Sequence, residues 1–193
     1  MFALYLKELI EWNKKFNLTA ITDPEEIKVK HFEDSLTILQ SIPLSNQSVI
    51  DIGAGAGFPG IPLKIKCPGI KLTLVEATKK KFEFLKHLIS ILKLDNTEAI
   101  WGRAEELNQD FRYYGKYDLA VARAVAKLNK LVEYALPFLK TNGLFIAQKG
   151  PNIDEEIKLA GKALKKFGGK IQEVKRLQLS NGDKRTLVVI SKL

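Results

Sequence analysis

The sequence predicts an α/β protein: a doubly wound, mostly parallel seven-stranded sheet with a helical appendage at its N-terminus. From residue 48 onward, short apolar runs alternate with segments of helical length, which is typical of a parallel sheet covered by helices on both faces. Before residue 46, apolar residues recur only at helical spacing. The predicted division is therefore a helical appendage over residues 1–45 and a second domain over residues 46–193.

The appendage is predicted to contain two helices. The first covers residues 2–17, because one helical face is formed by Tyr5, Leu9, Trp12 and Phe16. A second helix should begin at Asp23, which suits the N-cap, with Pro24 in the first turn and Glu26 completing a capping box. This helix is expected to run to about residue 41, with an inward face formed by Val29, Phe32, Leu36 and Leu39.

Seven strands and five helices are expected in the remaining chain. The predicted strands are residues 49–52, 71–76, 97–101, 117–122, 143–148, 170–178 and 185–191. The predicted helices between them are residues 61–66, 79–94, 104–111, 128–139 and 153–167. Because no segment of helical length separates the last two strands, they must form an antiparallel pair, which we place at one edge of the sheet.

Composition favours a polyanionic partner. The chain carries 31 Lys+Arg against 22 Asp+Glu, a formal net charge of +9, and such an excess is common in proteins that bind nucleic acid. Cys67 is the only cysteine, which excludes an internal disulfide and a cysteine-based zinc site, and we predict no metal site. No apolar run approaches the ~20 residues that span a membrane, and no basic region precedes the first apolar residues. We therefore expect a cytoplasmic protein without a membrane segment, acting as a monomer.

A glycine-rich turn directly follows the first predicted strand. Gly53, Gly55 and Gly57 alternate after an apolar run, and Pro59 then suits a helix start. A dinucleotide fingerprint G-x-G-x-x-G would require glycine where Phe58 stands, and no Gly-Lys-Ser/Thr of a P-loop follows. Asp51 at the strand end suits a cationic ligand better than a diphosphate. The turn therefore favours S-adenosylmethionine, which carries a sulfonium cation.

Polar residues follow the next strands at the same expected edge. Glu76 ends the second strand 23 positions after Gly53, where an acidic side chain binds ribose hydroxyls in this architecture. Glu105 lies in the loop after the third strand, and Arg123 ends the fourth. Ligands bind at the carboxyl ends of strands in open α/β sheets. Two structural alternatives stay open: Glu105 as an exposed first-turn helix residue, and Arg123 as an ion-pair partner.

Several segments together resemble one protein family. They occur in the order Asn17–Thr22, His31-x-x-Asp34-Ser35-Leu36, Asp51–Pro62, Arg103-Ala104-Glu105 and Ala122–Val125. In these segments the chain resembles the bacterial small-subunit ribosomal RNA guanine-N7 methyltransferases, the glucose-inhibited division protein B family. The resemblance covers nearly the whole chain, and generic methyltransferases share the glycine turn but neither the first segment nor the last.

The resemblance implies a Rossmann-like class I methyltransferase that uses S-adenosylmethionine and modifies N7 of a guanine in 16S ribosomal RNA or the small subunit. Because N7 carries a free lone pair, no general base is required and no catalytic residue is predicted. Arg123 and Lys149 are candidates for holding the guanine or a phosphate, and His31 and Asn17 are weaker candidates for shaping the pocket. The turn and the resemblance together predict these cofactor-binding residues: Gly53, Ala54, Gly55, Gly57, Phe58, Glu76, Ala104, Glu105 and Arg123.

Three other functions are compatible with parts of the pattern. A methyltransferase acting on a protein or a small molecule would share the glycine turn, but the basic excess disfavours it. A nicotinamide-dependent oxidoreductase is disfavoured by Phe58 in the fingerprint. A non-catalytic RNA-binding module with the same fold would bind RNA without transferring a methyl group.

Overall fold

One seven-stranded sheet runs through the computed structural model, which describes all 193 residues. The strand order is β3-β2-β1-β4-β5-β7-β6. The parallel strands are β1 (Ser48–Ile52), β2 (Lys71–Glu76), β3 (Thr97–Trp101), β4 (Tyr117–Arg123) and β5 (Leu139–Lys149). β7 (Lys184–Lys192) pairs antiparallel with both β5 and the edge strand β6 (Gly169–Gln178). The predicted antiparallel pair at one edge is confirmed, and the strand order reverses between β1 and β4, where ligands bind in such sheets.

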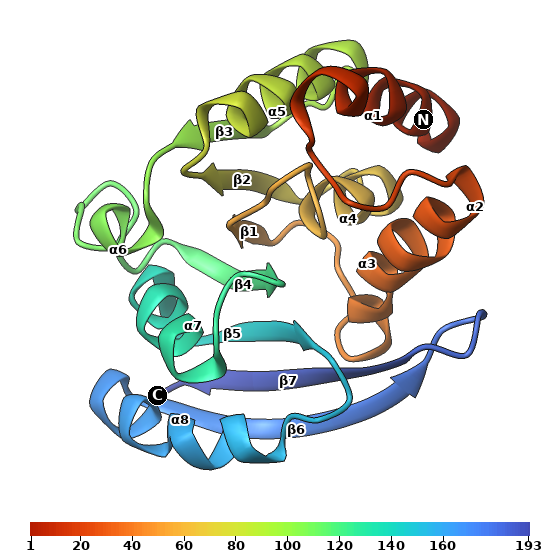
Figure 1. Cartoon of the computed structure of the whole chain (residues 1–193). Helices are drawn as coiled ribbons and strands as arrows, with labels where there is room; N and C mark the ends of the chain where they lie inside the picture. The colour runs from red at the N-terminus through yellow and green to blue at the C-terminus, as the bar shows by residue number, and fades with distance from the viewer.

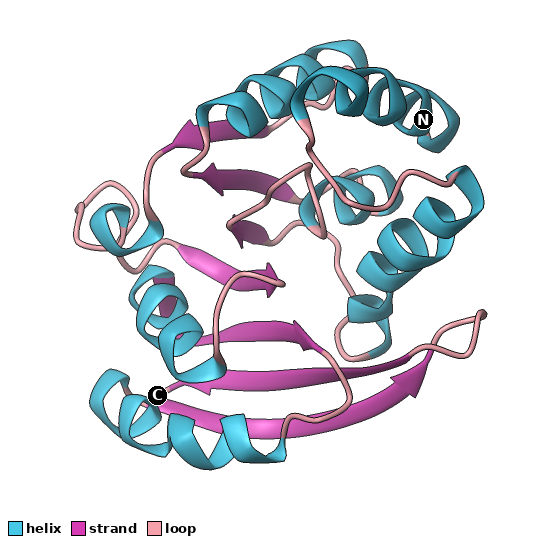
Figure 2. Ribbon diagram, in the orientation of Figure 1, coloured by secondary structure: helices cyan, strands magenta, loops and turns pink.

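Helices cover both faces of the sheet (Figures 1 and 2). On one face, α4 (Gly60–Lys66) and α5 (Lys79–Ile91) pack together with the N-terminal helices. On the other face lie α6 (Ala104–Leu107), α7 (Leu128–Ala135) with the 3-10 turn η3 (Leu136–Phe138), and α8 (Asp154–Phe167). The predicted α/β class with two helical layers is therefore confirmed. None of these helices combines the length and the apolar character that crossing a membrane requires.

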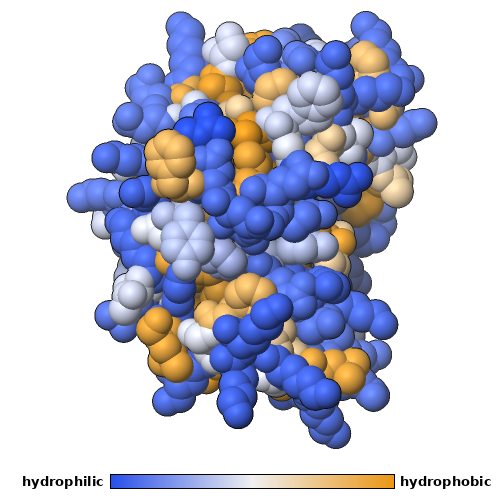
Figure 3. All heavy atoms as spheres, turned by 90° about the vertical axis from the view of Figure 1, so that its left-hand side faces the viewer, coloured by the Kyte–Doolittle hydropathy of each residue, from blue (hydrophilic) through white to orange (hydrophobic).

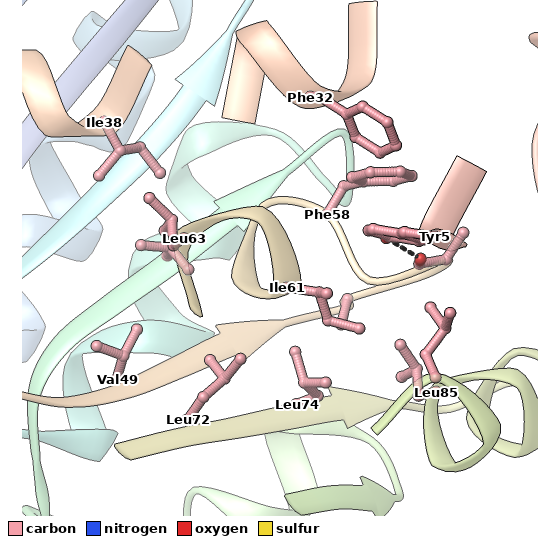
Figure 4. Packing of buried hydrophobic residues seen from close by; sticks show 14 of the residues in the cluster. Tyr5, Phe32, Ile38, Val49, Phe58, Ile61, Leu63, Leu72, Leu74 and Leu85 are labelled. Carbon is pink, nitrogen blue, oxygen red and sulfur yellow. Dashed lines mark hydrogen bonds between the residues drawn. The ribbon is translucent and has the colours of Figure 1, made fainter. Parts of the chain in front are cut away.

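The first helix, α1 (Phe2–Phe16), forms as predicted and lies along α5 (Figure 1). Its residues share a core with the sheet rather than forming a separate one. Tyr5 and Leu9 are fully buried in a cluster of 25 residues that also contains Val49 and Leu72. Figure 4 shows Tyr5 and Phe32 beside Phe58, with Ile61 of α4 between these rings and the strands. The division at residue 45 stays a prediction, because this apolar cluster crosses it.

The second predicted helix is a continuous but irregular helical segment. It consists of α2 (Pro24–Ile27), the π-helical turn η1 (Lys28–Glu33), α3 (Asp34–Leu36) and the 3-10 turn η2 (Thr37–Gln40). Asp23 caps it as predicted, accepting a hydrogen bond from the Glu26 N–H, whereas the Glu26 carboxylate pairs with Lys30 instead of completing a capping box.

The buried positions of this segment differ in part from the predicted ones. Buried positions are Asp34, Ser35 and Ile38, whereas the predicted Leu36 and Leu39 are only half-buried. Leu36 and Leu39 still pack against the core, so the predicted inward face is confirmed in part, whereas Val29 is only half-buried. The prediction missed Asp34, whose carboxylate lies inside the molecule.

Candidate functional site

The glycine turn lies at the carboxyl end of β1 and is closed on both sides by side chains. Gly53 has a left-handed φ of +66°, and a Cβ there would lie 2.7 Å from a methyl carbon of Val125. Gly57 has φ +100°, and a Cβ there would lie 2.7 Å from the Tyr5 hydroxyl oxygen. Both conformation and space therefore exclude a larger residue at these two positions.

The turn is supported from the first helix. The Tyr5 hydroxyl donates a 2.5 Å hydrogen bond to the carbonyl oxygen of Ala56, and its ring stacks on Phe58 with centroids 5.3 Å apart (Figure 4). Burial raises the pKa of Tyr5 well above its usual value, so the hydroxyl stays a donor. The sequence places Tyr5 only on an apolar helix face, because no residue near it in the sequence indicates that its hydroxyl binds Ala56.

Glu76 holds the other side of the turn. One carboxylate oxygen accepts the Gly55 N–H at 2.8 Å, and the other accepts the Thr78 N–H at 2.7 Å. The side chain is almost completely buried at the end of β2. A carboxylate has about four lone-pair sites, so these two bonds leave acceptors for a ribose diol. The predicted acidic residue therefore also ties the glycine turn to the neighbouring strand.

A small pocket of 220 Å³ opens beside the turn, between the ends of β1, β2 and β3, the start of α6 and Tyr134 of α7. Most of its wall is apolar. The structure brings together three of the predicted cofactor-binding residues here, Gly53, Ala104 and Glu105. Val75 and Val125 were not predicted, although Val125 belongs to one of the segments that carry the family resemblance.

Asp51 does not face this pocket. Side chains alternate along β1, so Asp51 points to the α4 side of the sheet, opposite to Ile52. It is fully buried, and one carboxylate oxygen accepts the Gly60 N–H at 2.7 Å. Burial raises the pKa of Asp51 to about 7. The interpretation of Asp51 as a counter-charge for a cationic ligand was therefore wrong.

A second pocket, of 330 Å³, lies at the ends of β4 and β5 against the irregular helical segment, and we call it the basic pocket. Its lining residues are Lys30, His31, Asp34, Arg123, Ala124, Gln148, Lys149, Gly150 and Arg185. The structure thus brings Arg123, Lys149 and His31 together. The loop of residues 123–126 separates the two pockets, because Arg123 and Ala124 line one and Val125 and Ala126 line the other.

Arg123 is fixed by the helical segment. Its guanidinium donates to the Lys30 carbonyl at 2.9 Å, contacts Asp34 at 3.3 Å and donates to His31 Nδ1 at 3.1 Å. The same group lies 5.0 Å from the ring centre of Phe58. Arg123 and Phe58 therefore pack against each other, and neither lines the small pocket that contains Gly53.

His31 is held neutral by these contacts. His31 Nδ1 lies 3.1 Å from both an Arg123 nitrogen and the Lys30 carbonyl oxygen, and Nε2 lies 2.8 Å from the Thr19 hydroxyl. In the neutral tautomer with its proton on Nε2, Nδ1 accepts from the guanidinium and Nε2–H donates to Thr19. Burial, together with the positive charge of Arg123, lowers the pKa of His31 to about 4. Asn17 lies elsewhere: it ends α1 with a left-handed φ of 49° and lines a separate cavity, so its predicted role in this pocket was wrong.

Lys149 anchors the loop between the pockets. Its ammonium donates to the Ala126 carbonyl at 3.0 Å and pairs with Glu156 at 2.7 Å. Glu156 in turn accepts the Leu128 N–H at the start of α7. Lys149 therefore positions the 123–126 loop and also adds positive charge to the basic pocket.

Comparison with known proteins agrees with this architecture. A solved S-adenosylmethionine-dependent methyltransferase from Aquifex aeolicus superposes with a TM-score of 0.63, covering 89% of this chain and 94% of its own, at 16% sequence identity. The sheet, the glycine turn and the acidic end of β2 place the protein in the Rossmann-like class of S-adenosylmethionine-dependent methyltransferases. The family model described as "GidB: rRNA small subunit methyltransferase G" matches residues 1–188, and the chain belongs to this family.

Two relatives show how far the similarity extends. Ribosomal RNA small subunit methyltransferase G of Thermoanaerobacter sp. (strain X514) is 48% identical over 194 aligned positions, 100% of this chain and 81% of that protein. The protein of the same name from Alkaliphilus metalliredigens (strain QYMF) is 50% identical over 191 positions, 98% of this chain and 80% of that protein. The predicted family, fold class and cofactor are thereby confirmed, and the nicotinamide-dependent alternative is excluded.

Proposed function

We propose that the protein transfers the methyl group of S-adenosylmethionine to N7 of a guanine in the 16S ribosomal RNA of the small subunit. One observation carries this proposal: two pockets of different chemistry share the 123–126 loop as a wall. The small apolar pocket suits the methyl donor, and the basic pocket suits a nucleotide. Family membership and the net charge of +9 support an RNA substrate.

The residues of the small pocket and the turn fit S-adenosylmethionine. Apolar walls such as Val75 and Val125 suit an adenine ring, and Glu76 retains acceptors for the ribose. The turn presents backbone at Gly53, where a side chain would collide with Val125. When bound, S-adenosylmethionine supplies a methyl group on a positively charged sulfur. We keep Ala54, Gly55, Gly57, Ala104 and Glu105 in this proposed site, and Phe58 and Arg123 as residues that shape its border.

Catalysis needs orientation more than proton transfer. Guanine N7 has a free lone pair and attacks the methyl carbon in line, while a neutral thioether leaves. Well-oriented reactants can supply roughly 7–11 kcal/mol of the required barrier reduction. Arg123 and Lys149 hold the phosphate or the base edge in the basic pocket, and the target base must leave its stack to enter. We propose that the protein does this as a cytoplasmic monomer.

The decisive experiment incubates the protein with labelled S-adenosylmethionine and small ribosomal subunits that lack the modification. We expect label at N7 of a guanine, located by mapping the methylated base. Free small-subunit RNA, ribosomal proteins and small metabolites serve as alternative acceptors. Transfer to protein or metabolite would favour the other methyltransferase function, and donor binding without any transfer would favour a non-catalytic RNA-binding module.

A further inference from the structure

Two buried oxygens in the basic pocket have no hydrogen-bond partner. They are Oδ1 of Asp34 and Oε1 of Gln148. Both side chains line the pocket, and each residue is only 4% exposed. Buried acceptors are almost always paired in folded proteins, so two orphaned acceptors that line one pocket indicate a ligand that donates hydrogen bonds.

Both side chains are fixed through their other ends. The Gln148 amide nitrogen donates to the Asp34 carbonyl at 2.6 Å and to the Thr37 hydroxyl at 3.1 Å, which identifies the free atom as the amide oxygen. The second carboxylate oxygen of Asp34 accepts from Arg123 at 3.3 Å and from Arg185 at 3.2 Å. The two free oxygens therefore belong to fixed side chains that line a pocket whose other charged side chains are positive.

We propose that Asp34 Oδ1 and Gln148 Oε1 accept the N1–H and N2–H groups of the target guanine and so select this base. Guanine presents two adjacent donors on that edge, whereas adenine presents an acceptor at N1 and no amino group at C2. The cationic side chains Lys30 and Lys149 suit the phosphate of the same nucleotide. With its donor edge held this way, the base keeps N7, on its opposite edge, open to the methyl donor. This inference rests on the proposed function.

The same contacts favour the reaction itself. As the bond from sulfur to the methyl carbon breaks, its electron pair stays on sulfur, and the new bond from N7 to that carbon leaves the purine with a positive charge. The charge makes N1–H more acidic, so its hydrogen bond to the Asp34 carboxylate strengthens in the transition state. An interaction that is stronger in the transition state than in the ground state accelerates the step.

The test compares the affinities of three nucleotides for the protein saturated with S-adenosylhomocysteine. Guanosine, inosine and adenosine 5′-monophosphates are titrated and followed by NMR. Inosine lacks the amino group, and adenosine lacks both donors. For the wild type we expect about tenfold weaker binding of the inosine nucleotide and about a hundredfold weaker binding of the adenosine nucleotide, since one buried hydrogen bond corresponds to roughly tenfold.

Two variants remove one acceptor each. Gln148→Met and Asp34→Asn should each reduce the preference for guanosine over adenosine about tenfold or more, and Gln148→Met, which removes the acceptor for the amino group, should equalise guanosine and inosine. Matched controls at exposed positions, Gln172→Met and Asp154→Asn, should keep the wild-type preference. Unchanged affinity for S-adenosylhomocysteine shows that a variant is folded. If Asp34→Asn binds S-adenosylhomocysteine more weakly than the wild type does, the Gln148→Met variant alone tests the proposal.

The outcomes separate this inference from the proposed function. A wild type that does not prefer the guanosine nucleotide, or variants that keep the full preference, would overturn the role of the two oxygens even if ribosomal RNA is methylated. If the two variants lose the preference for guanosine but the wild type methylates no ribosomal RNA, the result would support the base-reading site and contradict the proposed function.

Discussion

Asp51→Asn should stabilise the protein progressively as the pH rises. Asp51 is fully buried and has one paired oxygen, on the Gly60 N–H, and one oxygen without a partner. Its pKa is raised from 3.8 to about 7, chiefly by burial and further by Glu76, while the Gly60 bond and Arg123 oppose the shift. Asparagine keeps the shape and an oxygen for Gly60 but cannot ionise.

The magnitude follows from proton linkage. Between pH 3.8 and about 7 the unfolded chain has released the Asp51 proton and the folded protein retains it, so stability falls as the pH rises. This loss of folding stability is absent below pH 3.8 and reaches its full size above about pH 7. At about 1.4 kcal/mol per unit, it amounts to about 2 kcal/mol at pH 5 and about 4 kcal/mol at pH 8. The free energy of unfolding of the asparagine variant, relative to wild type, should therefore increase by about 3 kcal/mol between these pH values.

Urea denaturation followed by circular dichroism at pH 5 and pH 8 measures this difference. Comparing the two pH values cancels any constant effect of the new amide group. Asp154→Asn, at an exposed ion pair with Arg176, is the matched control and should show no such change. If the difference in free energy of unfolding between Asp51→Asn and the wild type is the same at both pH values, within about 0.5 kcal/mol, the raised pKa inferred from the burial of Asp51 is refuted.

Three further predictions concern ligand binding. Gly55→Val places a branched side chain at φ +60°, a strain of about 1–2 kcal/mol, and should raise the Kd of S-adenosylmethionine about tenfold or more in calorimetry. Glu76→Ala releases the Gly55 and Thr78 N–H groups and should raise the same Kd about a hundredfold with an unchanged circular dichroism spectrum; an unchanged Kd in either variant contradicts the proposed cofactor site. RNA affinity should fall steeply as salt rises, because phosphate contacts release counterions, and a flat response in a filter-binding titration would exclude a basic RNA-binding face.

Most of the fold was predictable because local signals agree with the final topology. The strand at residues 49–52 is a short apolar run between turn residues, and its bounds were off by only one residue. The segment of residues 24–41 was harder, because a π-turn depends on packing rather than on sequence period. Asp34 is buried on the inner face of this segment, and a search for apolar residues at helical spacing passes over it because it is charged.

The site was predictable only where the sheet itself assembles it. Gly53, Ala104 and Glu105 meet because each follows a parallel strand, and carboxyl ends of such strands share one edge. The contacts of Arg123 with Asp34 and of Tyr5 with Ala56 join residues 89 and 51 positions apart. Such pairings depend on how the N-terminal helices pack on the sheet, which no local pattern specifies.

The bond from Tyr5 to the glycine turn has a consequence for genetics. A substitution in the first helix that removes this support should appear as poor cofactor affinity, although the altered residue touches no cofactor. A survey of inactivating substitutions would then group Tyr5 with the residues of the turn, far from it in the chain. Any related enzyme that lacks this helix must hold its turn in place from another part of its structure.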